Sequence, residues 1–200
     1  MGIGALMAKR KAIFLDRDGV LNAAIIKNGK PYPPATLTDL VIPDDVPEAL
    51  HKLKSAGFML IGATNQPDVA RGTVAKETVE AINTRLMTVL ALDEIRVCYH
   101  DDKDQCECRK PLPGLLTQAA KEHGIDLPAS IMIGDRWKDI EAGQRAGCKT
   151  VWLDYHYQEA SPQRPPDCVA MSLIEAANWI CPGVIQPVTP PPILDRSDRG

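Results

Sequence analysis

The chain has 200 residues, of which 44% are hydrophobic and 24% charged, which suits one globular domain or at most two small ones. Its formal net charge of −3 gives no reason to expect a nucleic acid or an anionic membrane surface as a partner, and no apolar run is as long as a membrane span. Residues 1–11 place a short apolar piece before basic residues, the reverse of a secretory signal, so we expect a cytoplasmic, monomeric protein whose start is Met1 or Met7.

Five short apolar runs occur along the chain, and each is followed by polar residues. Uninterrupted runs of this length are typical of strands that are buried on both faces of a parallel sheet. We therefore predict strands over residues 12–15, 58–63, 95–99, 131–134 and 150–153.

The segments between these runs carry apolar residues at helical spacing. We predict helices over about 46–53, 74–91, 114–123 and 138–146, with Asp45 and Glu48 as a capping box for the first and Gly57, Gly124 and Gly147 at C-terminal caps. Strands that alternate with helices predict a doubly wound, Rossmann-like parallel α/β sheet. In such sheets ligands bind beyond the carboxyl ends of the strands.

Two segments fit neither pattern. Residues 23–43 contain the hairpin-forming pair Asn28-Gly29 after apolar residues, and we predict a flap or substrate loop there. Residues 182–200 are rich in proline and form either an extended tail or a lid or partner contact. We expect a single domain over 1–181.

Asp16 and Asp18 follow the first predicted strand in the sequence DRDG. Aspartate and glycine are common in turns, so this tetrapeptide alone does not distinguish a turn from a catalytic pair. A calcium loop of the EF-hand type is a poor fit, because its glycine stands at position six and Gly19 stands at position four.

Further polar side chains follow other strands. A carboxylate such as Asp16 can attack phosphorus, provided that a divalent cation and a lysine screen the charge of the phosphate. Asp18 would point to the same side and could transfer the proton. The remaining candidates are Asp135 as an Mg²⁺ ligand, Asp139 as its support or only a helix N-terminal charge, Lys110 as the neutralising cation, and Thr64 and Asn65 as phosphate-binding donors before a helix.

These motifs resemble those of the haloacid dehalogenase (HAD) superfamily over about residues 10–155. Asp16-Arg17-Asp18-Gly19 is similar to its first motif, and Thr64, Lys110 and Gly134-Asp135 with Asp139 are similar to the other three. The resemblance implies catalytic Mg²⁺ at Asp16, Asp135 and the backbone carbonyl of Asp18. It also implies a phospho-aspartate at Asp16 and acid–base work by Asp18, the residue that phosphatases have and dehalogenases lack.

Three cysteines and a histidine lie within eleven residues: Cys98, His100, Cys106 and Cys108. Three thiolates and an imidazole make a complete tetrahedral set for a structural Zn²⁺, although disulfides or an unliganded loop are the alternatives. Since Arg109 and Lys110 follow directly, such an ion would fix their direction. Cys148, Cys168 and Cys181 are scattered and fit small core residues.

The cysteine loop narrows the resemblance to a capless subgroup that contains the heptose-1,7-bisphosphate 7-phosphatases and the histidinol-phosphate phosphatases. The subgroup implies a sugar bisphosphate or a related phosphorylated metabolite as the substrate, and no large cap domain. It also implies that Arg109 contacts the part of the substrate away from the reacting phosphate, with Asn65, Gln66 and Arg71 as further contacts. The short loop from His100 to Cys106 and the segment NGKPYPPATLTD depart from the heptose enzymes and leave the substrate open. A catalytically inactive, zinc-stapled binding module is the alternative of another class.

Overall fold

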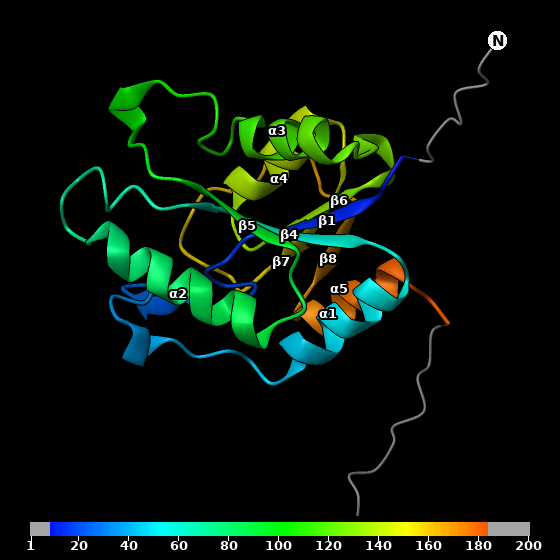
Figure 1. Cartoon of the computed structure of the whole chain (residues 1–200), viewed down its shortest axis with the longest axis horizontal. Coiled ribbons are helices and arrows are strands. Elements are labelled where there is room, and N and C mark those ends of the chain that lie inside the picture. Colours follow the sequence, from blue (N-terminus) through cyan, green and yellow to red (C-terminus); the bar gives the residue numbers. More distant parts are fainter. Residues whose placement is uncertain (1–8, 184–200) are drawn as a thin grey trace, which may run out of the picture.

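A six-stranded parallel sheet with helices on both faces forms the centre of the computed structural model, which describes residues 9–183 (Figure 1). The strand order is β5-β4-β1-β6-β7-β8, so that β1 lies between β4 and β6. The strands are β1 (Ala12–Leu15), β4 (Met59–Asn65), β5 (Glu94–Cys98), β6 (Ile131–Gly134), β7 (Lys149–Leu153) and β8 (Cys168–Ala170). The doubly wound parallel sheet and all five predicted strands are confirmed.

Five α-helices cover the sheet, α3 and α4 on one face and α1, α2 and α5 on the other (Figure 1). Their bounds are α1 (Asp45–Ser55), α2 (Lys76–Val89), α3 (Gly114–His123), α4 (Trp137–Ala146) and α5 (Leu173–Ile180). Short 3-10 helices span Leu37–Asp39, Asp102–Asp104 and Leu127–Ala129. Within the described residues no helix is long and apolar enough to cross a membrane, and no large cap domain interrupts the sheet.

The central strand β1 is buried on both faces. Ile13 and Leu15 pack into the core beneath α1, α2 and α5, whereas Ala12 and Phe14 pack on the opposite side against α3. All four are fully buried, and burying one large apolar side chain contributes about 1.5–3 kcal/mol to folding. This packing fixes the end of β1, and hence the position of Asp16, which follows it.

The last strand and helix, β8 and α5, were not predicted. β8 has only three residues, of which Val169 is 56% exposed, so its apolar pattern is weak. The start of α5 does carry a signal that could have been found, because the side chain of Ser172 caps the backbone N–H of Glu175.

The capping box predicted at Asp45 and Glu48 is wrong. Asp45 is the first residue of α1, and its carboxylate accepts a hydrogen bond from the backbone N–H of Ile174, at the start of α5. The side chain thus caps a helix that is distant in the sequence. The predicted caps at Gly124 and Gly147 are confirmed, since both end their helices in the left-handed conformation.

The predicted hairpin is confirmed in residues 23–43. Strands β2 (Ile25–Lys27) and β3 (Lys30–Tyr32) pair antiparallel, and Asn28 and Gly29 turn between them with φ angles of 51° and 71°. The backbone N–H of Gln158 donates to the carbonyl of Gly29 at 2.9 Å, which ties the hairpin to the loop after β7.

Candidate active site

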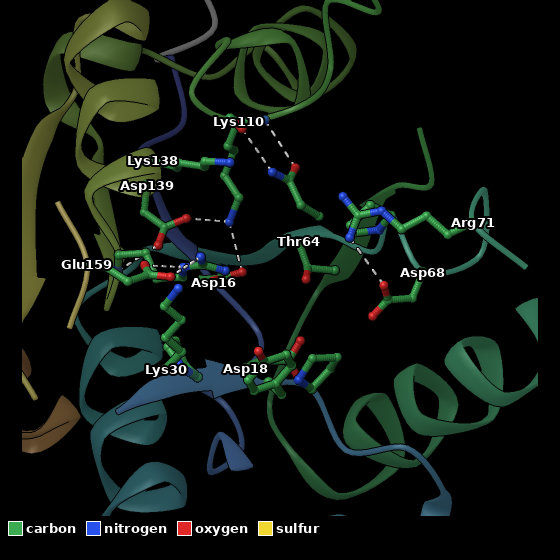
Figure 2. Close-up of a pocket in the computed structure, with 16 residues that line it drawn as sticks. Asp16, Asp18, Lys30, Thr64, Asp68, Arg71, Lys110, Lys138, Asp139 and Glu159 are labelled. Atoms are coloured by element: carbon green, nitrogen blue, oxygen red, sulfur yellow. Dashed lines mark hydrogen bonds and ion pairs between the residues drawn. The ribbon is translucent and has the colours of Figure 1, made fainter. Parts of the chain in front are cut away.

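A cavity opens at the carboxyl ends of β1 and β4, beside the start of α4 (Figure 2). Its polar lining residues come from the strand ends, the hairpin, the loop after β4 and the loop after β7. They are Asp16, Asp18, Lys30, Tyr32, Thr64, Asn65, Asp68, Arg71, Lys110, Arg136, Lys138, Asp139 and Glu159. The fold thus gathers residues from widely separated parts of the sequence, as parallel sheets do at this edge.

Asp16 and Lys110 form a buried ion pair at the centre of the site. The Asp16 Oδ1 atom accepts from Lys110 Nζ and from the backbone N–H of Arg17, both at 2.8 Å. Asp16 Oδ2 accepts no hydrogen bond from the residues that the structure describes. Oδ2 is therefore the oxygen that is free to attack an electrophile or bind a cation.

Lys110 is held on several sides. Its ammonium also contacts the Ala63 carbonyl at 2.6 Å and Asp139 Oδ1 at 2.5 Å, as the dashed lines to the two aspartates in Figure 2 indicate. Burial would lower the pKa of Lys110, but the carboxylates of Asp139 and Asp16 outweigh it and raise that pKa. Lys110 is therefore a permanent cation beside Asp16.

Asp139 serves as a counter-ion and as a helix-start residue. Besides the ion pair with Lys110, its Oδ2 accepts from the backbone N–H of Arg136 at 3.1 Å, just before α4. Burial and then the charge of Asp16 raise the pKa of Asp139 to about 6. Both carboxylate oxygens of Asp139 have protein partners, so Asp139 supports the site by holding Lys110 in place.

Asp135 is the clearest candidate for a metal ligand. It is buried, and within the described chain neither of its carboxylate oxygens has a hydrogen-bond partner. One oxygen from each of Asp16, Asp135 and Asp139 lies within 4.8 Å of the others. Burial, Asp16 and Asp139 raise the pKa of Asp135 well above its usual range.

The charges of this cluster fit a divalent cation. Three carboxylates beside one lysine ammonium leave two negative charges uncompensated in a buried place, which is costly unless a cation binds there. Oxygen ligands of this kind suit Mg²⁺. Gly19 leaves the space open, because a Cβ on it would lie 1.9 Å from Asp135 Oδ2.

Asp18 faces the cavity with its carboxylate held in place by three side chains. Arg17 donates from Nε to Oδ1 at 3.1 Å and from Nη2 to Oδ2 at 3.0 Å. Asn22 and Gln66 donate to the same two oxygens at 3.1 and 2.8 Å. Gln66, which was predicted to help position a leaving group, thus contacts Asp18, the residue expected to transfer a proton to that group. Arg17 and Asn22 were not predicted, although both stand within or next to the first motif.

Thr64 and Asn65 are the last two residues of β4. Thr64 lines the cavity, and its Oγ1 accepts from Gln66 Nε2 at 3.0 Å. The side chain of Asn65 exchanges two hydrogen bonds with the backbone of Lys110, at 2.9 and 3.1 Å. Turns separate β4 from α2, which begins at Lys76, close to the start predicted for that helix at about residue 74.

The two arginines expected to contact substrate lie in different places. Arg71 lines the cavity, and its guanidinium contacts Asp101 at 2.6 Å and Asp68 at 3.4 Å. Arg109 does not line this cavity; its Nε donates to Asp102 at 2.7 Å and its Nη1 to the His100 carbonyl at 3.3 Å. The structure therefore brings Arg71 to the site and leaves Arg109 beside the cysteine loop.

Six of the polar lining residues were not predicted from the sequence: Lys30, Tyr32, Asp68, Arg136, Lys138 and Glu159. Arg136 Nε donates to Glu159 Oε2 at 2.8 Å, and a second bond joins Arg136 Nη2 to Oε1. Burial and then the charge of Arg109 lower the pKa of Lys138. Arg136 and Lys138 could have been predicted because they lie within three residues of Asp135. Lys30 and Glu159 could not, because the hairpin and the loop after β7 bring them to the cavity.

The three cysteines and the histidine converge on one point beside Lys110. The Sγ atoms lie 3.0–3.6 Å from one another, and His100 Nδ1 lies 3.6 Å from Cys98 Sγ and 3.3 Å from Cys108 Sγ. In a tetrahedral zinc site with Zn–S bonds of about 2.3 Å, neighbouring sulfur atoms lie about 3.8 Å apart, which is close to the distances between these Sγ atoms. All six cysteines are free, so the disulfide alternative is wrong. The donor set fits a structural Zn²⁺.

Comparisons with known proteins match most of the chain. A family model described as HAD-hydrolase-like matches residues 107–176. A D-glycero-D-manno-heptose-1,7-bisphosphate 7-phosphatase of Thermosynechococcus vestitus is 34% identical over 197 residues, covering 86% of this chain and 96% of that protein. The D-glycero-beta-D-manno-heptose-1,7-bisphosphate 7-phosphatase of Haemophilus influenzae is 39% identical over 150 residues, covering 70% of this chain and 78% of that one.

Among solved structures, a D,D-heptose 1,7-bisphosphate phosphatase from B. bronchiseptica, crystallised with magnesium and phosphate, has a TM-score of 0.71. It is 28% identical, and the match covers 85% of this chain and 97% of that one. The similarity therefore extends over most of this chain and almost the whole of that one.

Proposed function

This chain belongs to the HAD-like hydrolases, in the family of the heptose-1,7-bisphosphate 7-phosphatases, and on that premise we propose that it is a phosphatase of small sugar bisphosphates. One observation carries the proposal: Asp16, the Lys110 ammonium and the unpartnered carboxylate of Asp135 meet in a buried cluster at the end of the central strand. Such a cluster has what a carboxylate nucleophile needs to attack a phosphate dianion.

The best candidate substrate is D-glycero-D-manno-heptose 1,7-bisphosphate, cleaved at position 7. It is supported by relatives named heptose-1,7-bisphosphate 7-phosphatases, which are 34–39% identical to this chain over most of their length. The cavity adds cationic side chains beyond those that hold Asp16, which suits a substrate with more than one phosphate. Histidinol phosphate is the alternative that the resemblance to the family left open. It has a single phosphate and would therefore contact fewer of these cationic side chains.

In the first half of the proposed reaction, an oxygen of Asp16 attacks the phosphorus of the substrate in line with the leaving oxygen. The bond from phosphorus to the sugar oxygen breaks, and Asp18 gives its proton to that oxygen. Thr64 and Lys110 bind the phosphoryl oxygens, while Arg17, Asn22 and Gln66 keep the Asp18 carboxyl in place. The product of this half is phospho-Asp16 and the free sugar hydroxyl.

In the second half, Asp18 takes a proton from a water molecule, whose oxygen attacks the phosphorus of phospho-Asp16. The bond from phosphorus to the aspartate oxygen breaks, which releases inorganic phosphate and restores the Asp16 carboxylate. Asp18 is then protonated again and ready for the next substrate. Thus one carboxyl group acts as nucleophile and the other carries a single proton back and forth.

We propose two metal ions with different tasks. Asp16, Asp135 and the backbone carbonyl of Asp18 would hold Mg²⁺, which neutralises charge on the transferred phosphoryl group when bound. Cys98, His100, Cys106 and Cys108 would hold Zn²⁺ as a closed structural site next to Lys110. The free cysteines support a reducing, cytoplasmic compartment.

The proposed function is tested by a panel of phosphorylated metabolites assayed with Mg²⁺. We expect the highest kcat/KM for heptose 1,7-bisphosphate, with release of the 7-phosphate. A preference for histidinol phosphate would contradict the substrate, and no turnover of any phosphomonoester would favour an inactive binding module. Fluoroberyllate, which binds the free Asp16 carboxylate as a mimic of phospho-Asp16, should inhibit the enzyme.

A further inference from the structure

The ammonium of Lys110 ends a long side chain, so its position beside Asp16 depends on what holds the lysine. It contacts Asp16, Asp139 and the Ala63 carbonyl, so that each of its three protons has an acceptor. The backbone of Lys110 is held separately, by the side chain of Asn65. The segment directly after Lys110 has a contact of its own, with α4.

Helix α4 holds the lysine and the segment after it at two separate points. Arg145, on the last turn of the helix, donates from Nη1 to the carbonyl oxygen of Pro111 at 3.0 Å. Asp139, on the first turn, contacts the ammonium of Lys110. These two helical residues are about 9 Å apart along the helix axis. One helix therefore holds both the end of the Lys110 side chain and the backbone of the residue that follows Lys110.

The position of α4 is itself set by the sheet. A Cβ on Gly134, at the end of β6, would lie 2.1 Å from the Cβ of Asp139. A Cβ on Gly143, within the helix, would lie 2.6 Å from the Cβ of Met132 in β6. The two glycines therefore let α4 approach β6 more closely than larger residues would permit. A helix seated in this way is a firm support for the segment that contains Lys110.

The direction of the Arg145 side chain is set by Glu141, one turn earlier on α4. Arg145 Nη2 donates to Glu141 Oε2 at 2.7 Å, while Nη1 donates to Pro111. Glu141 is 5% exposed, and its Oε1 has no hydrogen-bond partner within residues 9–183. Because a buried carboxylate with an unpartnered oxygen costs stability, stability alone does not explain this pair. Its structural consequence is that the guanidinium of Arg145 is directed at the carbonyl of Pro111.

We propose that Arg145 is a positioning residue for Lys110: it holds the Pro111 carbonyl so that the lysine ammonium stays between Asp16 and Asp139. The inference rests on the proposed function, in which Lys110 binds the transferred phosphoryl group. Arg145 does not line the cavity, so it acts on the reaction only through Lys110. Since electrostatic stabilisation of a transition state depends on close placement of the charge, a small displacement of the ammonium lowers the rate.

The first test is the kinetics of Arg145→Met on the best substrate of the metabolite panel, with Mg²⁺ and zinc present. We expect kcat to fall by about 10-fold and KM to change by less than about 3-fold, because Lys110 acts mainly in the transition state. Zinc content and melting temperature should change little, since Arg145 is 42% exposed. Arg145→Lys can still donate to the Pro111 carbonyl and should restore kcat to within about 3-fold of the wild type.

A double-variant cycle shows whether Arg145 acts through Lys110 or only stabilises α4. In the Lys110→Met background, Arg145→Met should lower the remaining kcat by less than about 2-fold. An equal loss in both backgrounds would overturn the proposal. The matched control is Lys76→Met, which removes an exposed (i, i+4) ion pair with Glu80 on α2 and should leave kcat unchanged.

A readout independent of turnover is the ammonium signal of Lys110 in protein that carries ¹⁵N-labelled lysine. A buried ammonium with three acceptors exchanges its protons slowly, so the wild type should show a resolved signal, which Lys110→Met removes and thereby assigns. Arg145→Met should shift this signal or abolish it through faster exchange, whereas Lys76→Met should leave it in place.

The outcomes separate the inference from the proposed function. Full kcat in Arg145→Met, or an ammonium signal that this variant leaves unchanged, would overturn the inference and leave the phosphatase intact. A wild type without activity on any phosphomonoester would refute the proposed function. In that case the ammonium signal would still decide whether Arg145 positions Lys110.

Discussion

Two clusters of candidate metal ligands lie near Lys110, and they differ in how the chain assembles them. The cysteine cluster takes its four donors from residues 98–108, whereas the carboxylate cluster takes Asp16 from the end of β1 and Asp135 and Asp139 from the segment after β6. The first is a local loop, and the second exists only once β1 and β6 pair in the sheet. The cysteine cluster therefore follows from the short spacing of its donors in the sequence, and the carboxylate cluster follows from the tertiary fold.

The two clusters also differ in what they leave open. Three thiols and an imidazole fill a tetrahedral set and leave no position for a substrate. Asp16 and Asp139 instead line the cavity, and the buried Asp135 keeps two carboxylate oxygens without partners among residues 9–183. From this difference we expect the carboxylate cluster to control turnover and the cysteine cluster to control stability, and the following variants test that division.

The largest effect is expected for Asp16→Asn. Removal of the nucleophile should lower kcat by more than about 10⁴-fold, while the zinc content and the melting temperature change little. Steady-state kinetics and metal analysis of the purified variant measure both properties. A variant that kept substantial turnover would rule out a phospho-aspartate at this position. Asp93→Asn, which removes a partly exposed carboxylate paired with Lys54, is the matched control and should keep full activity.

Asp135→Asn should lower the activity without lowering the stability of the metal-free protein. Without metal, Asp135 is a buried and unpartnered carboxyl group with a raised pKa, so its charge destabilises the fold at neutral pH. We expect the variant to lose Mg²⁺ affinity by about 100-fold or more, yet to melt at the same or a higher temperature in EDTA. Thermal melts with EDTA and with Mg²⁺ test this; a wild type that Mg²⁺ does not stabilise would contradict the assignment.

Cys106→Ser should act mainly on stability. Loss of one thiolate from the four-donor set should remove the zinc and lower the melting temperature by roughly 10 °C, the equivalent of about 3 kcal/mol for a domain of this size. The activity should fall less, by about 10-fold, through the displacement of Lys110. The control is Cys168→Ser, a half-buried cysteine on β8 outside the loop, which should keep one zinc per chain. If Cys106→Ser retained full zinc, the closed set would be refuted.

The contrast between local and distant clusters also explains what the sequence could predict. The cysteine cluster and the hairpin at Asn28-Gly29 were visible because their signal is spacing within a few residues. The ends of the strands were visible because buried parallel strands have continuous apolar runs. That Asp16 and Asp135 share one edge of the sheet was predicted because both follow parallel strands, but the order of the strands that makes them neighbours could not be predicted from spacing alone.

The residues that were missed depend on contacts between distant loops. Asp45 caps α5 instead of its own helix, because the ends of α1 and α5 lie together in space. Lys30 reaches the cavity because a backbone bond from Gln158 fixes the hairpin. Arg109, which the resemblance to a family assigned to substrate contact, donates to the carboxylate of Asp102, seven residues before it, and does not line the cavity. In each case a tertiary contact decided between positions that the sequence permits equally.

The smallest effect is expected at Asp101, whose ion pair with Arg71 connects the cysteine loop to the cavity. Its carboxylate lies next to His100 and accepts from Arg71 at 2.6 Å, and this hydrogen bond lowers the pKa of Asp101 to about 2. A depressed pKa means that the pair is formed above the usual carboxyl range and is lost only as the pH falls toward 2. Between pH 5 and 8 the link should therefore not titrate. In Asp101→Asn we expect KM to rise by less than about 3-fold, with a constant ratio to the wild type across that range and unchanged zinc content. The neighbouring exposed variant Lys103→Gln should show no change; a ratio that varied with pH would show that another group links the cysteine loop to Arg71.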